Sequence, residues 1–201
     1  MPEGDAVFSD NPCAAGCGKS AISGGNLCGI HCADNGAESA RIAAEIEGQR
    51  SISSLNAALL NFERRDFSRR TFLGCNFTES IFIDCDFSGC LMRRVFFDFA
   101  AFSRCNFSGC DLQFLSFGGC AIDDCTFHGS ELLHLNFCGT RVSDTVFYSS
   151  NLYNSRFINA ELLRVKIDDC NVKKVFFLNA KQDEVLFKSS NTAEAIFELE
   201  G

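Results

Sequence analysis

Large apolar side chains recur at every fifth position of the chain, beginning at Phe62 and ending at Phe197. This series has 28 positions, of which 26 are large and apolar, and the exceptions are Gln182 and Thr192. An α-helix repeats its apolar positions roughly every 3.6 residues and a β-strand roughly every 2 residues, so neither element alone produces this spacing. The pattern predicts an internal structural repeat with a unit of five residues.

A second series of positions lies two residues before each large apolar position, and its side chains are mostly small or of modest size. The three remaining positions of each unit are mostly polar or glycine, as in residues 85–89, CDFSG. We predict that the large and the small position both face inward and that the other three face outward. The inward cysteines are then Cys75, Cys85, Cys90, Cys105, Cys110, Cys120, Cys125 and Cys170, whereas Cys138 faces outward.

These units resemble those of the pentapeptide-repeat family, whose consensus is a small residue, Asp or Asn, Leu or Phe, a polar residue and often Gly. Residues 105–109, CNFSG, carry the resemblance clearly, and it continues for about 140 residues without a break in register. The resemblance implies four units per coil, and hence an all-β solenoid in the form of a right-handed quadrilateral β-helix of about seven coils. With strands stacked about 4.8 Å apart, the rod would be roughly 30–35 Å long.

The same pattern divides the chain into three parts. We predict a Cys/His-rich segment over residues 1–35, a capping helix and linker over residues 36–59, and the repeat β-helix over residues 60–199. Within the last part, one side of the rod stacks phenylalanine at every coil, from Phe77 to Phe197. The two sides that flank it change partly to aliphatic residues, which fills a core of fixed width without overpacking.

Four residues break the inward pattern near the two ends of the repeat. Arg65 and Arg70 occupy small inward positions at the start, and Gln182 and Thr192 occupy large apolar positions near the end. Since the ends of a solenoid need caps, we interpret both zones as terminal coils.

Residues 37–48 read as a short amphipathic helix. Ile42, Ala43 and Ile46 share one face, and Gly48 is a suitable stop signal. We expect this helix to cover the N-terminal end of the rod. The alternative is a helix that packs elsewhere or frays.

A cluster of metal-binding residue types precedes this helix, in residues 13–32, CAAGCGKSAISGGNLCGIHC. Thiolate and imidazole groups suit tetrahedral zinc. A segment this small needs a cross-link, such as a bound metal ion, to hold its fold. The string resembles small zinc knuckles that attach to other bacterial domains, although its C-x3-C spacing departs from the commoner two-residue spacing. We expect one structural zinc ion, and the alternative is a flexible tail with free thiols. The predicted ligands are Cys13, Cys17 and Cys28 with either His31 or Cys32.

Two groups of outward apolar residues predict interfaces. One lies on the all-phenylalanine side, which has few charges, and large exposed apolar patches usually mark interfaces. The other lies in the last coil and predicts a homodimer through that coil, as the resemblance also implies; the alternatives are scattered exposed aliphatics and a monomer with a frayed end. The predicted interface residues are Phe96, Phe99, Ile158, Phe176 and Leu178 on the first surface, and Leu186, Ile196 and Leu199 on the second.

The charge pattern limits the kinds of partner. The net charge of −8 is divided evenly between residues 1–60 and 61–201, and the second part holds 19 acidic and 15 basic residues. There is no basic footprint, so we expect no direct nucleic-acid binding. No apolar run reaches 18 residues, and the first residues lack a signal peptide. We therefore expect no membrane partner, a cytoplasmic protein and reduced cysteines.

Catalytic motifs are absent from the sequence. Besides His31, the chain has only His128 and His134, at outward positions on different sides of the rod, and no Gly-rich phosphate loop follows a strand-helix pattern. We expect no enzymatic activity and predict a protein-interaction or scaffold module with a protein partner. The alternative is a DNA-mimicking modulator of a type II topoisomerase such as gyrase. The resemblance implies this alternative, because some pentapeptide-repeat proteins have that function. That function requires acidic sides, whereas the acids here alternate with bases.

Overall fold

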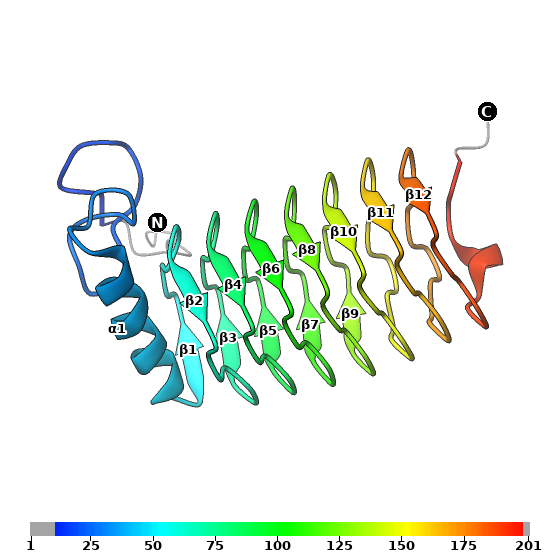
Figure 1. The fold of residues 1–201 in the computed structure, drawn as a ribbon, viewed down its shortest axis with the longest axis horizontal. Coiled ribbons are helices and arrows are strands. Elements are labelled where there is room, and N and C mark those ends of the chain that lie inside the picture. The colour runs from blue at the N-terminus through cyan, green and yellow to red at the C-terminus, as the bar shows by residue number, and fades with distance from the viewer. Residues whose placement is uncertain (1–10, 199–201) are drawn as a thin grey trace, which may run out of the picture.

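The computed structural model describes residues 11–198, in which one α-helix precedes a long parallel β-solenoid (Figure 1). Helix α1 spans Asn35–Glu47, and a 3-10 helix, η1, spans Thr192–Glu194 near the other end. The solenoid strands are β1 (Ser51–Ser53), β2 (Asn61–Glu63), β3 (Thr71–Leu73), β4 (Ile81–Ile83), β5 (Leu91–Arg93), β6 (Ala101–Ser103), β7 (Asp111–Gln113), β8 (Ala121–Asp123), β9 (Glu131–Leu133), β10 (Arg141–Ser143), β11 (Glu161–Leu163) and β12 (Lys181–Asp183).

Each coil takes twenty residues, so residues twenty apart lie side by side in parallel register. Phe62 pairs with Phe82, and Phe72 pairs with Met92. The sides are called faces 1 to 4, in the order in which the chain follows them. Face 1 is the seven-stranded sheet β12-β11-β10-β8-β6-β4-β2, and face 3 contains the five-stranded sheet β1-β3-β5-β7-β9. Face 2 is held by isolated bridges between positions 66 and 186, and face 4 by those between positions 56 and 196.

The core is a set of phenylalanine columns, as the five-residue period predicts. Phe117 on face 4 is fully buried and stacks on Phe97 and Phe137, with ring centroids 5.1 and 5.0 Å away. Rings on opposite faces meet edge to face, as Phe117 does with Phe127 on face 2. Both arrangements are favourable for aromatic pairs. Burial of each ring stabilises the fold by about 1.5–3 kcal/mol before the loss of conformational entropy is subtracted.

Many of the small inward positions hold a cysteine, serine or threonine that donates a hydrogen bond within the rod. The thiol of Cys120 lies 2.9 Å from the carbonyl oxygen of Phe97, and the hydroxyl of Ser130 lies 2.7 Å from that of Phe107. A buried polar group is tolerated when it has such a partner. This explains why cysteine, serine and threonine replace one another at this position of the repeat.

The solenoid begins earlier than residue 60, the boundary that the periodicity predicted. Strand β1 already pairs with β3, and Ile52 and Ala57 are buried in the same core as Phe62. Both residues continue the five-residue step backwards from Phe62. Ala57 is too small to be recognised as a core position by size, so the first part of this coil, residues 51–59, falls within the segment interpreted as a linker.

Helix α1 covers the N-terminal end of the rod, as predicted (Figure 1). The side chain of Asp34 accepts a hydrogen bond from the Ala37 N–H and caps the start of the helix, and Gly48 ends it. Ile42 and Ile46 are fully buried and join the solenoid core.

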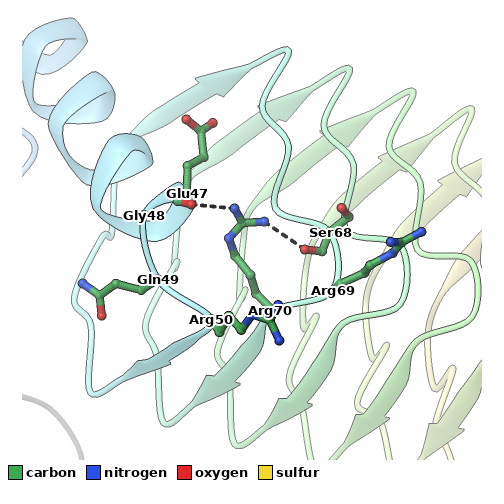
Figure 2. A pocket seen from close by; sticks show the side chains of 7 residues that line it. All are labelled: Glu47, Gly48, Gln49, Arg50, Ser68, Arg69 and Arg70. Atoms are coloured by element: carbon green, nitrogen blue, oxygen red, sulfur yellow. Dashed lines mark hydrogen bonds between the residues drawn. The ribbon is translucent and has the colours of Figure 1, made fainter.

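Arg70 links the end of this helix to the rod. Its guanidinium donates to the backbone carbonyls of Ile46, Glu47 and Ser68, each at 2.8 Å. Figure 2 shows the side chain reaching from the coil towards the end of α1, beside a pocket that Arg50 and Arg69 also line. A cation near a helix C-terminus satisfies free carbonyls and the helix dipole. Arg70 is therefore tolerated at a small inward position because it points into this junction.

The other end of the rod is less well packed. Gln182 is exposed in β12, Thr192 begins η1, and Phe187 and Phe197 are only partly buried against the core. The polar residues at large apolar positions thus mark a terminal coil, as predicted. Among the described residues, no helix is long and apolar enough to cross a membrane.

Candidate functional site

A compact turn structure in residues 11–34 brings the predicted metal ligands together. Pro12 and Ser20 form an antiparallel bridge, and the Cys13 N–H donates to the Lys19 carbonyl at 2.9 Å. Gly16 and Gly18 have φ values of 70° and 79°, which favour glycine and allow the chain to reverse between these contacts. Cys13 and Cys17 are thereby placed against the second half of the segment.

Four side chains form the cluster: Cys13, Cys17, Cys28 and His31 have ligand atoms that all lie within 4.8 Å of one another. The Sγ atoms of Cys17 and Cys28 are 3.7 Å apart, and His31 Nδ1 lies 3.5 Å from Cys13 Sγ and 3.4 Å from Cys28 Sγ. With Zn–S distances of about 2.3 Å and Zn–N distances of about 2.1 Å, tetrahedral geometry requires about 3.8 Å between sulfurs and about 3.6 Å between sulfur and nitrogen. The group can therefore hold a metal ion.

Cys32 lies outside this cluster. Its thiol donates to the Gly29 carbonyl at 3.4 Å, and its side chain packs against the core. Of the two residues that the spacing left open as fourth ligand, the structure brings His31 to the other three. All thirteen cysteines are free thiols, and the 3.7 Å separation in the cluster is far longer than a disulfide bond.

Backbone donors favour the ionised form of one ligand. The pKa of the Cys13 thiol is lowered to about 6, chiefly because the Cys28 N–H donates to its sulfur at 3.4 Å. Further contributions come from the backbone near Ala15 and from His31. The thiolate is the form of cysteine that binds metal.

Hydrogen bonds attach this segment to the first coil of the rod. Asn56, which is 2% exposed, donates through Nδ2 to the Ala21 carbonyl at 2.6 Å, and its N–H donates to the Ser23 hydroxyl at 2.8 Å. Asn35 Nδ2 bridges the Gly29 and Leu59 carbonyls at 3.0 and 2.9 Å. The cluster and the rod are thus parts of one packed unit.

Gly29 permits the closest of these approaches. A β-carbon at this position would lie 2.6 Å from the Leu59 Cβ and 2.9 Å from the Ala58 carbonyl oxygen. Larger residues would therefore force the segment away from the rod.

The predicted interface residues that the structure describes lie at outward positions. Phe99 is the most exposed at 70%, and its neighbours on face 4, Gly118 and Gly119, have no side chains to cover it. In the last coil, Leu186 is 53% exposed, and Ile196 is half-buried and bridged to Phe176. The other predicted residues on face 4, Phe96, Ile158, Phe176 and Leu178, are half-buried, and Leu199 lies outside the described residues.

Sequence reasoning missed a group of aromatic side chains on face 3. Phe114, 58% exposed, stacks on His134, which in turn meets Tyr153 edge to face. His128 stacks instead on Tyr148, on face 2. A step of twenty residues from Phe114 leads to His134, so the signal was present in the repeat.

Three carboxylates of face 1, those of Asp84, Asp144 and Glu161, are paired with basic side chains one coil away. Arg104 Nε lies 2.6 Å from Asp84 Oδ1, and Lys181 Nζ lies 2.7 Å from Glu161 Oε1. The pKa of the Asp84 carboxyl is lowered, chiefly because of its hydrogen bond with Arg104. Acids and bases thus alternate along this face.

Comparisons with known proteins agree with this architecture. The family model "Pentapeptide repeats (8 copies)" matches residues 72–109, and the model "Pentapeptide repeat region" matches residues 100–177. Among curated proteins, none matches this sequence. The chain is a four-sided parallel β-solenoid built from five-residue units. It belongs to the pentapeptide-repeat family.

Several solved structures are similar in fold. HetL, a pentapeptide-repeat protein from the cyanobacterium Nostoc that is involved in the regulation of heterocyst differentiation, is 11% identical, with a TM-score of 0.32 over 80% of this chain and 96% of HetL. QnrB1, a plasmid-mediated fluoroquinolone resistance protein, is 16% identical, with a TM-score of 0.31 over 68% of this chain and 92% of QnrB1. A pentapeptide-repeat protein from the Arabidopsis thaliana thylakoid lumen is 15% identical, with a TM-score of 0.29 over 67% of this chain and 70% of the Arabidopsis protein.

Proposed function

We propose that this protein is a non-catalytic protein-interaction module, in which a rigid rod presents face 4 to a protein partner. The observation that carries this proposal is the apolar surface around Phe99, whose ring is 70% exposed beside Gly118 and Gly119. Exposure of a large ring costs solvation free energy that a partner surface recovers when it covers the ring.

We propose zinc as the ion held by Cys13, Cys17, Cys28 and His31. Three thiolates and one imidazole without an open position are typical of structural zinc sites. Zinc bound there would hold the two halves of the N-terminal segment together. Through the contacts of Asn56 with Ala21 and Ser23, it would also support the first coil.

We further propose that two copies associate through the last coil. Leu186 is exposed, and the rings of Phe187 and Phe197 are only partly buried. A twofold contact would cover these residues on both copies. Light scattering on the protein and on a Leu186→Asp/Ile196→Asp variant tests this, and a monomeric mass for the unchanged protein contradicts it.

The free thiols are consistent with a cytoplasmic role, since a reducing compartment preserves them. The DNA-mimic alternative requires an uninterrupted acidic surface. The pairing of Asp84 with Arg104 and of Asp144 with Arg164 counts against it.

Site-specific photo-crosslinking in the source organism tests the main proposal. A photoreactive phenylalanine analogue replaces Phe99 on face 4, and the matched control replaces Lys188, which is exposed on face 2. We expect a discrete protein adduct from position 99 and none of the same mass from position 188. Equal adducts from both positions, or none from position 99, contradict the proposal.

A further inference from the structure

One edge of the rod, where face 3 turns into face 4, carries cations and aromatic rings and no acidic residue. The edge comprises three outward positions in each of five successive coils, and we name these fifteen residues the aromatic–cationic edge. Its members are Arg93, Arg94, Phe96, Gln113, Phe114, Ser116, Leu133, His134, Asn136, Tyr153, Asn154, Arg156, Lys173, Lys174 and Phe176. The absence of acids is notable in a chain whose net charge is −8.

Coil-to-coil hydrogen bonds align these residues into a continuous strip. The Phe114 N–H donates to the Leu133 carbonyl at 3.2 Å, and the His134 N–H donates to the Tyr153 carbonyl at 3.1 Å. The same register continues along the strip from Arg94 in its first coil to Lys174 in its fifth. Four steps of about 4.8 Å place these two positions about 19 Å apart along the rod.

The rings at the middle of the edge are held in fixed positions. The Phe114 and His134 rings stack with centroids 5.0 Å apart and an interplanar angle of 8°. Tyr153 meets His134 nearly perpendicularly, with centroids 5.9 Å apart, and Asn154 Nδ2 lies 2.8 Å from His134 Nδ1. Because these side chains pack on one another before a ligand arrives, their ordering on binding costs less conformational entropy.

The charges of the edge differ from those of face 1. Arg94, Arg156 and Lys174 are exposed, and no carboxylate of residues 11–198 lies within 4.0 Å of their charged groups. Lys174 Nζ instead lies 5.6 Å from the centroid of the Tyr153 ring. Cations that lack an internal partner are available to an external anion.

Arg93 and Lys173 are the paired cations of the edge, bonded to Asp111 and Glu194. These acids lie outside the fifteen positions. Asp111 and Glu194 would repel a polyanion that carries a charge on each monomer, such as a nucleic acid.

We propose that the aromatic–cationic edge binds an extended acidic segment of the partner protein. Its carboxylates would meet Arg94, Arg156 and Lys174, and its apolar side chains would pack on the Phe114 and Tyr153 rings. An extended chain rises about 3.3 Å per residue, so about six residues span the edge. The proposal rests on the proposed function, and it specifies the chemistry of the partner. Single-stranded nucleic acid is disfavoured by the overall negative charge.

Fluorescence anisotropy with short labelled probes tests this proposal. The main probe is a peptide of about six residues that alternates Glu and Phe, matched to the length of the edge. One comparison peptide has Gln in place of every Glu, and one comparison probe is an oligothymidine of similar length. The edge variant is Arg94→Glu/Arg156→Glu/Lys174→Glu. The control variant, Arg69→Glu/Lys166→Glu/Lys188→Glu, changes the net charge equally at exposed positions off the edge.

We expect the Glu/Phe peptide to bind the unchanged protein, more weakly as salt is raised. The edge variant should bind it at least about tenfold more weakly, and the control variant should differ by less than about threefold. The proposal is overturned if the two variants lose affinity equally, if the Gln/Phe peptide binds as tightly, or if oligothymidine binds the edge more tightly. A Phe99 adduct that persists in the edge variant, together with unchanged peptide affinity, overturns this inference but leaves the proposed function standing.

Discussion

The ring of Phe99 lies over Gly119, its neighbour one coil further along face 4. A β-carbon on Gly119 would lie 2.7 Å from both Cδ1 and Cε1 of that ring, closer than nonbonded carbon atoms approach. Gly139, one coil later, has the same φ of 66° but nothing within 4 Å of an added β-carbon. The two glycines therefore separate the effect of backbone conformation from the effect of contact with Phe99.

We expect Gly119→Ala to destabilise the protein more than Gly139→Ala does. Both changes place alanine in the left-handed region, at a cost of about 1–2 kcal/mol, and only the first also displaces Phe99. Urea denaturation of both variants measures the difference. In a Phe99→Ala background the two changes should become equal, and a difference that persists there contradicts this explanation.

Phe117→Ala should reduce the free energy of unfolding by about 3–5 kcal/mol, because the buried ring leaves a cavity between its stacked neighbours. Phe197→Ala should cost less, since Phe197 is only partly buried at the end of the rod. Equilibrium denaturation measures both. A nearly neutral Phe117→Ala would show that the ring does not face the core.

The protein should contain one zinc ion per chain, measured by elemental analysis of untagged protein. Cys17→Ser should abolish this content because it removes one of the four clustered ligands. Cys32→Ser is the matched control and should retain the zinc, since Cys32 donates to the Gly29 carbonyl instead. Equal loss in both variants, or a content near zero that zinc supplementation cannot raise, contradicts the prediction.

The cysteines of the rod should differ sharply in reactivity. Burial raises the pKa of the Cys120 thiol to about 12 and that of Cys90 to about 11, so few thiolates form in the folded protein. Cys138 is half-buried at an outward position. Alkylation followed by peptide mass mapping should label Cys138 well before Cys120, and similar rates would mean that the coil opens readily.

Stability should fall in acid as the arginine pairs of face 1 are lost. Hydrogen bonds with Arg104 and Arg164 lower the pKa of Asp84 and Asp144. A carboxyl whose pKa is lower in the folded state binds fewer protons there. Its stabilisation is therefore present above the unfolded pKa of about 3.9 and is lost as the pH falls through the folded value. Urea denaturation between about pH 5 and pH 2 should show a shallower decline of stability for Asp84→Asn/Asp144→Asn than for the unchanged protein.

The repeat architecture could be predicted because each coil packs only on its neighbours. One inward ring, such as Phe97, therefore experiences the same surroundings as Phe117 twenty residues later, and a local pattern determines the whole topology. The start of the rod could not be predicted in this way. The first coil packs against α1 and the N-terminal segment, a contact that no later coil makes, and its position 57 holds only the small side chain of alanine.

For the metal cluster, residue types alone determined the candidates, and the tertiary structure chose among them. The N–H groups of His31 and Cys32 both donate to the Cys28 carbonyl within one turn. That turn directs His31 towards the thiols and Cys32 towards Gly29 and the core. The tertiary structure likewise determines the aromatic–cationic edge. Its residues are twenty apart in sequence, and only stacking of the coils brings their rings together. The same stacking leaves Arg94, Arg156 and Lys174 without a carboxylate partner among the described residues.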